Sequence, residues 1–144
     1  MIKSDNISDY KKHTTDPIYK SDNRNTTTNS DTRLENRKLR LAILGAGGIA
    51  RKMAETVNRM EKVELYAVAS RTEEKARQFA DTYHASRWYG SYEEMVADDR
   101  IDLVYIATPH SHHKEHTMLC LNHNRAVLCE KAFAVNTKEA EDMI

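Results

Sequence analysis

The chain has 144 residues, with 22 basic and 22 acidic side chains and a formal net charge of zero. This balance argues against a nucleic-acid-binding protein, and the length allows one domain with a sizeable core. Only two cysteines occur, Cys120 and Cys129, which are too few for a disulfide framework, so we expect a soluble protein in a reducing, cytoplasmic setting. No apolar run in the sequence is long enough to cross a bilayer, so we expect no membrane partner.

Residues 1–38 differ from the rest of the chain, because Ser, Asn, Asp, Thr and Lys crowd them and apolar residues are sparse. A segment of this composition buries too little apolar surface to repay the entropy of ordering. We expect a disordered leader here, followed by a folded domain over residues 39–144. A docking tail for a partner is the alternative, but no motif supports it.

The folded part is predicted to begin with a strand, a glycine-rich turn and a helix. The apolar run LRLAIL at residues 39–44 is followed by the turn GAGG and by helical periodicity from Gly48 to Met60. The pattern GxGxxA falls on Gly45, Gly47 and Ala50. In a dinucleotide fold the first glycine permits a tight turn, the second lets a pyrophosphate approach the backbone, and the small third residue lets helix and strand pack closely. The pattern predicts dinucleotide binding, with a merely tight turn as the alternative.

The predicted helix over residues 48–60 carries one apolar stripe for packing on a sheet. The stripe consists of Ile49, Met53, Val57 and Met60. A second strand is predicted over residues 63–70, where apolar residues alternate with the rest.

The carboxyl end of this second strand bears on the choice of cofactor. Many NAD-binding proteins place an acidic residue there for the ribose hydroxyls, whereas NADP-binding proteins offer an arginine and a small polar group to the extra phosphate. Here the strand ends in Ser70 and Arg71, and no acidic residue occurs before Glu73. We therefore favour NADP over NAD, with Arg71 as an ordinary solvated residue as the alternative.

Helices and strands continue to alternate along the chain. Further helices are predicted at residues 72–84, 91–96, 112–123 and 136–144, and further strands at residues 87–89, 101–107 and 126–129. The third and last helices begin with capping residues, Ser91 with Glu94 and Asn136 with Glu139. This alternation predicts an α/β fold, a Rossmann-like doubly wound parallel sheet. Ligands of such sheets bind beyond the carboxyl ends of the strands.

Four motifs in order, GAGGIA, ASRTEEKA, YIATPHSHH and CEKAFAVN, resemble the Gfo/Idh/MocA family of nicotinamide-dependent oxidoreductases, named after glucose–fructose oxidoreductase, inositol dehydrogenase and MocA. The resemblance covers residues 39–144. It implies hydride transfer between NAD(P) and the hydroxyl-bearing carbon of a sugar, cyclitol or dihydrodiol. Family members carry a further substrate domain and often form dimers or tetramers. Because no counterpart of that domain occurs here, we expect a truncated enzyme that alone turns over little or no polyol.

The resemblance also implies which residues hold the cofactor. The pyrophosphate would lie on the turn, the adenosine ribose at the end of the second strand, and the nicotinamide-side ribose after the strand at residues 101–107. In that order, the implied residues are Gly45, Gly47, Gly48 and Ile49, then Ser70 and Arg71, then Thr108, Pro109 and His110. His113 matches the histidine of the family's TPNxxH stretch, and His110 takes the place usually held by Asn.

Lys131 matches the lysine of the family's EKP motif, with Glu130 as its neighbour and Ala132 in place of the proline. The resemblance implies that this lysine lies beside the nicotinamide and the reacting hydroxyl. A desolvated lysine can polarise such an oxygen or relay its proton as hydride leaves the carbon. The alternative is an exposed lysine paired with Glu130.

Four histidines cluster at positions 110, 112, 113 and 116. His112 and His116 lie one helical turn apart and could chelate a metal, but neither HExxH nor a cysteine set accompanies them. We therefore expect no metal site and favour ring stacking and hydrogen bonds near the cofactor or at the helix start.

Two other functions stay open at this point. A methyltransferase also carries a glycine turn after its first strand, although the last two of the four motifs favour the oxidoreductase. A non-catalytic NAD(P)-binding module or an inactive gene fragment is the third reading, and it is consistent with Ala132 and the missing substrate domain.

Overall fold

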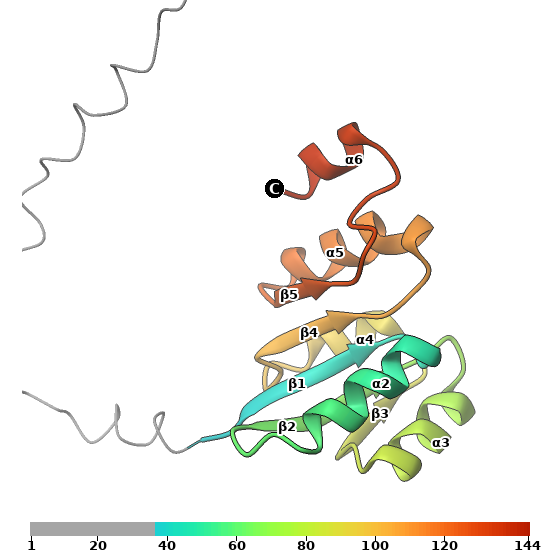
Figure 1. Cartoon of the computed structure of the whole chain (residues 1–144), viewed down its shortest axis with the longest axis vertical. Coiled ribbons are helices and arrows are strands. Elements are labelled where there is room, and N and C mark those ends of the chain that lie inside the picture. The colour runs from blue at the N-terminus through green and yellow to red at the C-terminus, as the bar shows by residue number, and fades with distance from the viewer. Residues whose placement is uncertain (1–36) are drawn as a thin grey trace, which may run out of the picture. The chain divides into compact units, whose positions relative to one another are not determined.

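The computed structural model describes residues 37–144, and within them five parallel strands form one sheet (Figure 1). The strands lie in the order β3-β2-β1-β4-β5, and every neighbouring pair is parallel. The predicted doubly wound α/β sheet is therefore confirmed, with the strand order reversing between β1 and β4. The strands are β1 (Leu39–Leu44), β2 (Val63–Ala69), β3 (Arg87–Tyr89), β4 (Leu103–Ile106) and β5 (Ala126–Cys129). The leader predicted at residues 1–38 lies outside the described residues except for Arg37 and Lys38.

Helices cover both faces of this sheet (Figure 1). Helices α2 and α3 contribute to the apolar cluster on one face, and α4 and α5 to the cluster on the other. The helices are α2 (Gly48–Val57), α3 (Glu73–Tyr83), α4 (Tyr92–Ala97), α5 (His113–Asn122) and α6 (Thr137–Asp142), with a 3-10 turn η2 (His110–His112) before α5.

Strand β1 lies at the centre of the sheet and is buried on both sides. Leu41 and Ile43 belong to the cluster under α2 and α3, whereas Ala42 and Leu44 belong to the cluster under α4 and α5. Successive side chains of a strand point to opposite faces, so a strand with helices on both sides needs a continuous apolar run. The run LAIL meets that requirement.

Helix α2 ends at Val57, so the predicted extension to Met60 is wrong. The predicted stripe is also partly wrong, because Ile49 and Met60 are exposed. The buried face consists of Ala50, Ala54 and Val57. Alanines bring the helix backbone close to the sheet, and this close approach decides which face is buried.

Strand β2 does not alternate between buried and exposed residues as predicted. Residues 65–69 are all buried. The reason is that helices cover both faces of the sheet, so the side chains of either parity are shielded from water.

The two predicted helix caps occupy their expected positions. The Ser91 side chain accepts a hydrogen bond from the Glu94 amide at 3.3 Å, and that of Asn136 accepts one from the Glu139 amide at 2.9 Å. Such bonds satisfy amides that the first helical turn leaves free. The last helix ends at Asp142, so the prediction that it contains Ile144 is wrong.

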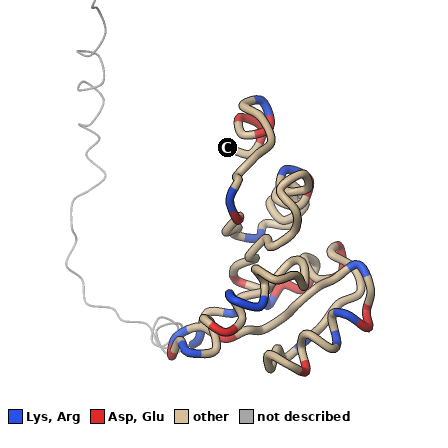
Figure 2. The backbone as a smooth tube through the Cα atoms, turned by 45° about the vertical axis from the view of Figure 1, so that its right-hand side comes forward, with Lys and Arg blue, Asp and Glu red and all other residues tan. Residues whose placement is uncertain are grey.

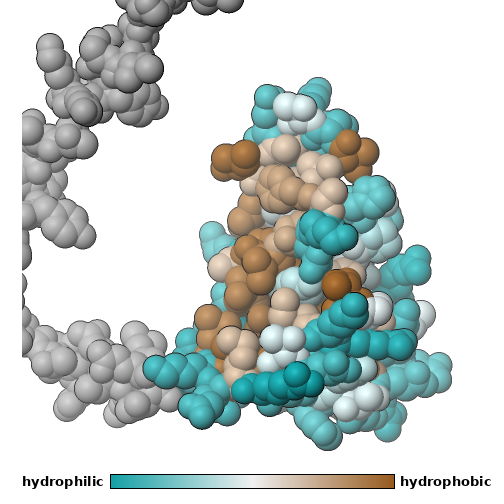
Figure 3. All heavy atoms as spheres, viewed as in Figure 1, coloured by the Kyte–Doolittle hydropathy of each residue, from teal (hydrophilic) through white to brown (hydrophobic). Residues whose placement is uncertain are grey.

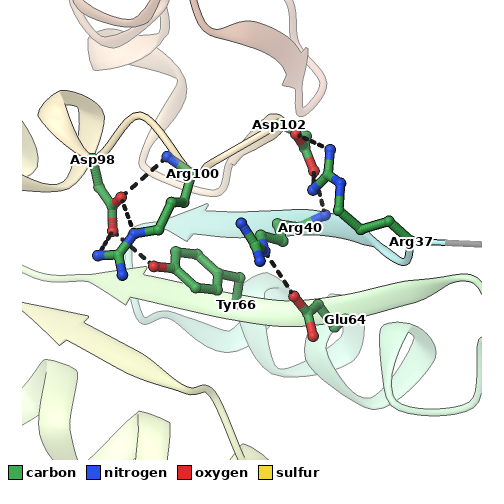
Figure 4. Close-up of polar contacts among 7 residues, drawn as sticks. All are labelled: Arg37, Arg40, Glu64, Tyr66, Asp98, Arg100 and Asp102. Atoms are coloured by element: carbon green, nitrogen blue, oxygen red, sulfur yellow. Dashed lines mark hydrogen bonds and ion pairs between the residues drawn. The ribbon is translucent and has the colours of Figure 1, made fainter. Parts of the chain in front are cut away.

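Ion pairs tie the amino ends of the central strands together (Figure 4). The Arg37 guanidinium donates to both carboxylate oxygens of Asp102, at 2.8 and 2.9 Å, and the Arg40 amide donates to the same carboxylate at 2.8 Å. Arg40 also pairs with Glu64 of β2 at 3.2 Å. These contacts join β1 to β2 and to the residue before β4 at this end of the sheet.

The surface of the described residues carries charges of both signs and exposed apolar side chains. Basic and acidic residues are interspersed along the described chain (Figure 2). Apolar residues gather on the visible face over β4 and β5 (Figure 3), and Leu128, Phe133 and Val135 are among the exposed ones. None of the described helices is both long and apolar enough to span a membrane.

Candidate functional site

The glycine turn after β1 has a backbone that only glycine adopts readily. Gly45 has a φ of +102°, and its amide donates to the carbonyl of Ala69 at the end of β2 at 2.9 Å. A Cβ at this position would lie 3.2 Å from the carbonyl group of Ala107, at the end of β4. The turn therefore passes between the carboxyl ends of the two strands that flank β1.

The next two glycines face open space. A Cβ built on Gly47 or Gly48 would meet no atom within 4 Å. Gly47 is the N-cap of α2, and no side chain of the described residues caps that helix. The amides of the first turn are thus free to donate to a ligand, and the helix dipole favours a negative one. A pyrophosphate fits this cradle in shape and in charge.

A cavity of about 390 Å³ lies beside the turn, at the carboxyl ends of β1, β2 and β4. Six of the predicted cofactor residues line it: Gly45, Gly47, Ser70, Arg71, Thr108 and Pro109. The other predicted site residues do not line it: Gly48, Ile49, His110, His113, Glu130 and Lys131. Tertiary structure thus brings together three of the predicted segments, from parts of the sequence up to 64 residues apart.

Arg71 shares the cavity wall with Lys75, a residue that the sequence argument missed. Both side chains are exposed, while Ser70 between them and β2 is buried. Lys75 lies four residues after Arg71, in the first turn of α3, and a second basic residue this close to the end of β2 is the signal that could have found it. Glu115 is the one carboxylate of the cavity lining, so basic groups dominate the wall.

Three aromatic rings outside the predicted cofactor residues also line the cavity: Tyr92 at the start of α4, His112 of η2 and His116 of α5. His116 Nδ1 lies 2.8 Å from the Thr108 hydroxyl, and the Tyr92 ring meets His116 edge-on at 4.9 Å between centroids. Burial lowers the pKa of His116, so its ring is neutral at neutral pH. His112 also lines the cavity and pairs with Glu115 at 3.5 Å. Within residues 37–144, no group of three or more potential ligand residues is arranged to hold a metal ion.

Glu130 and Lys131 lie at the carboxyl end of β5, outside the cavity wall. Lys131 is exposed and forms no ion pair with another described residue. The Glu130 carboxylate accepts hydrogen bonds from the Tyr105 hydroxyl and from the Lys131 amide, the latter at 3.0 Å. The sequence did not indicate this role for Tyr105, because the residue lies in an apolar strand and is expected to be part of the core.

His113 takes a different place from the one that the sequence predicts for a cofactor residue. Its side chain is buried, with 1% exposed, and does not face the cavity. Nε2 lies 2.9 Å from the carbonyl oxygen of Thr108, and Nδ1 lies 2.7 Å from that of Ala132. His113 therefore joins the segment after β4 to the segment after β5.

Comparison with known proteins identifies the family. The sequence model of an oxidoreductase family with an NAD-binding Rossmann fold, GFO_IDH_MocA, matches residues 39–144. The chain belongs to the Gfo/Idh/MocA family. The match covers every described strand and helix, and the resemblance inferred from the four motifs is confirmed.

Curated relatives in this family are sugar, cyclitol and dihydrodiol dehydrogenases. The chain is 44% identical over 106 residues to scyllo-inositol 2-dehydrogenase (NADP(+)) IolU of Bacillus subtilis, a match of 74% of this chain and 32% of that protein. It is 39% identical over 108 residues to trans-1,2-dihydrobenzene-1,2-diol dehydrogenase of Mus musculus, with the same two shares. The chain thus spans about a third of the length of these relatives.

Solved structures of oxidoreductases share the fold. A crystal structure of KijD10, a 3-ketoreductase from Actinomadura kijaniata in complex with NADP, aligns with a TM-score of 0.71 and 25% identity. The alignment covers 74% of this chain and 34% of that one.

Proposed function

We propose that residues 39–144 bind a nicotinamide dinucleotide, with NADP preferred to NAD, as the nucleotide-binding part of an oxidoreductase. The reaction is hydride transfer between the nicotinamide and the hydroxyl-bearing carbon of a sugar, cyclitol or dihydrodiol. The observation that carries the proposal is the open cradle at Gly47 and Gly48, which adjoins a cavity with basic walls.

Different parts of the dinucleotide bind at the start of α2 and at the cavity. The free amides at the start of α2, with the backbone of Gly45 to Ile49, hold the pyrophosphate. Thr108, Pro109 and His110 hold the ribose on the nicotinamide side. His113 supports this segment by its bond to the Thr108 carbonyl.

The preference for NADP rests on the end of β2. Ser70, Arg71 and Lys75 offer a hydroxyl group and two cations to the adenosine ribose, and no carboxylate follows β2 directly. An arginine in this place suits the 2′-phosphate, whereas NAD-binding sites use an acidic residue for the ribose hydroxyls. The names of the inositol dehydrogenase and the KijD10 complex, which both carry NADP, support the same preference.

Lys131 acts on the reacting hydroxyl group of the substrate. When bound, the nicotinamide supplies the hydride acceptor. The Lys131 amine polarises the substrate oxygen or takes its proton, and Glu130 holds the Lys131 backbone amide. The remaining contacts to the substrate come from residues outside 39–144, since this segment matches only about a third of the length of its relatives.

The proposal is tested by titrating the 144-residue chain with NADPH and with NADH and following the fluorescence of the reduced nicotinamide. We expect saturable binding of both, with a lower Kd for NADPH. The variant Arg71→Ala should raise the Kd for NADPH about 10- to 100-fold, the effect of losing a charge-assisted contact, and change that for NADH less.

Arg77→Ala is the matched control, because Arg77 is exposed on α3, the helix that follows Arg71, and pairs only with Asp81, at 4.0 Å, among the described residues. Its Kd for NADPH should equal that of the unmodified chain. Failure of the unmodified chain to bind either dinucleotide contradicts the proposed function, and equal losses in both variants contradict the role of Arg71.

A further inference from the structure

The segment that carries Lys131 is held from two sides by residues outside the cavity. From β4, the Tyr105 hydroxyl donates to Oε1 of Glu130, whose other oxygen accepts the Lys131 amide. From α5, His113 reaches the carbonyl oxygen of Ala132. The amide of Lys131 is therefore held by Glu130, which Tyr105 contacts in turn, and the carbonyl of the next residue, Ala132, lies against buried His113, while the Lys131 side chain stays exposed.

The two contacts of His113 indicate how many of its ring nitrogens carry a proton. Both of its ring nitrogens lie within 2.9 Å of backbone carbonyl oxygens, those of Thr108 and Ala132. A carbonyl oxygen only accepts, so each contact needs an N–H group, and a neutral imidazole has one such group. In the neutral ring, one nitrogen lone pair would face a carbonyl lone pair at hydrogen-bond distance. Only the imidazolium, which carries two N–H groups, satisfies both contacts.

One carboxylate lies in the neighbourhood of His113. The pKa of Glu130 is below its usual value, chiefly because of the Tyr105 hydrogen bond and in smaller part because of the charges of Lys131 and His113. No carboxylate of the described residues is within ion-pair distance of His113, so the two backbone carbonyls are the groups that stabilise a charge on its ring.

We propose that His113 is a buried imidazolium and that, together with Tyr105, it is a positioning residue that fixes the Lys131 backbone against the end of β4. The positioning role rests on the proposed function of Lys131. The proton count does not, because it follows from the two carbonyl contacts alone.

The proton count is tested by long-range ¹H–¹⁵N spectra of the 144-residue chain labelled with ¹⁵N in histidine. The spectra are recorded at about pH 8.5, well above the ordinary histidine pKa of about 6.5, with the solvent-exposed His84 as the reference. The His113→Asn variant assigns the His113 signals. We expect both His113 nitrogens to resonate as protonated nitrogens while those of His84 show one unprotonated nitrogen. An unprotonated nitrogen in His113 overturns the imidazolium.

The positioning role is tested with two ligands, NADPH and adenosine 2′,5′-bisphosphate, which is the adenosine half of NADP. Tyr105→Phe keeps the buried ring and removes only the hydroxyl that holds Glu130. We expect Tyr105→Phe and His113→Asn to raise the Kd for NADPH about three- to tenfold, as for the loss of one hydrogen bond, and to leave the Kd for the bisphosphate unchanged. A general loss of structure would weaken both ligands.

Tyr83→Phe is the matched control, because the Tyr83 hydroxyl makes no hydrogen bond to another described residue, and we expect it to bind both ligands as the unmodified chain does. If Tyr105→Phe and His113→Asn weaken both ligands equally, or neither, the positioning role is wrong. If the unmodified chain binds neither ligand, the proposed function and the positioning role fail, while the spectra still decide the proton count.

Discussion

Gly45 and Thr108 approach each other so closely that a Cβ at position 45 would lie 3.0 Å from the Thr108 methyl carbon. The two residues follow β1 and β4, the strands between which the strand order reverses. The first turn and the segment after β4 are therefore packed against each other at the crevice where an open α/β sheet binds its ligand.

This contact predicts a loss of stability in Gly45→Ala. The alanine must adopt a φ of +102° and also displace Thr108 or the Ala107 carbonyl. We expect the free energy of unfolding in urea to fall by about 2–4 kcal/mol, from left-handed strain and overpacking together. Gly48→Ala is the control, since its Cβ meets open space and it should unfold at the same or a higher urea concentration. Equal stability of Gly45→Ala and the unmodified chain would show that the turn relaxes.

Gly47→Val separates folding from cofactor binding. Gly47 has a φ of −96° and a ψ of −169°, an extended backbone that valine accepts, and its Cβ would project into open space. We expect the Tm to fall by no more than about 5 °C, since valine is a poorer N-cap than glycine, but the Kd for NADPH to rise at least about tenfold, because the branched side chain blocks the approach of a pyrophosphate to the amides of α2. Thermal unfolding by circular dichroism and a fluorescence titration measure the two effects. Unchanged NADPH affinity would place the pyrophosphate elsewhere.

The environment of Asp98 predicts how the free energy of unfolding changes at low pH. Its carboxylate accepts hydrogen bonds from Arg100 at 2.8 Å and from Tyr66 at 2.9 Å (Figure 4), and also from Tyr89 at 2.7 Å. The Asp98 side chain is only 5% exposed. Burial alone would raise the pKa of Asp98, but these hydrogen bonds outweigh it and bring the pKa well below its usual value. The contribution to stability is therefore complete above about pH 4, the pKa in the unfolded chain, and is lost as the pH falls through the lower pKa of the folded chain.

We accordingly expect Asp98→Asn to lower the free energy of unfolding at neutral pH by about 1–3 kcal/mol and to flatten its decline below about pH 4. Urea titrations across the acid range measure both. Asp81→Asn is the control, since that carboxylate is 68% exposed. A decline as steep in Asp98→Asn as in the unmodified chain would assign the acid sensitivity to other carboxylates.

The two cysteines should differ in their reactivity toward iodoacetamide. Burial raises the pKa of the Cys120 thiol to about 12, and the side chain is fully buried, whereas Cys129 at the end of β5 is partly exposed. Because the thiolate is the reactive form, we expect Cys129 to be alkylated first and Cys120 only when the chain unfolds. Mass spectrometry of peptides from native and urea-treated protein distinguishes the two sites. Faster alkylation of Cys120 in the native protein would contradict its burial.

Local patterns in the sequence were enough to predict most elements of the fold. Strand β5 begins and ends at the predicted residues, Ala126 and Cys129, and α3 lies within one residue of its predicted ends. The reason is that apolar periodicity, glycine turns and caps such as Ser91 act over a few neighbouring residues. The order of the motifs likewise sufficed for the family, because each motif is a local run of residues.

Only the tertiary structure decided which side chains meet. Lys75 and His116 come to one cavity because α3 and α5 begin at the same end of the sheet on opposite faces, and no periodicity encodes that meeting. Tyr105 reads as core in the sequence, yet its hydroxyl reaches Glu130 because β4 and β5 are paired in register. His113 occupies the position of the family's histidine, but the segment after β5 covers it. Its ring therefore contacts backbone carbonyls and does not line the cavity. Contacts between residues distant in the chain depend on how the layers pack, which the local pattern leaves undetermined.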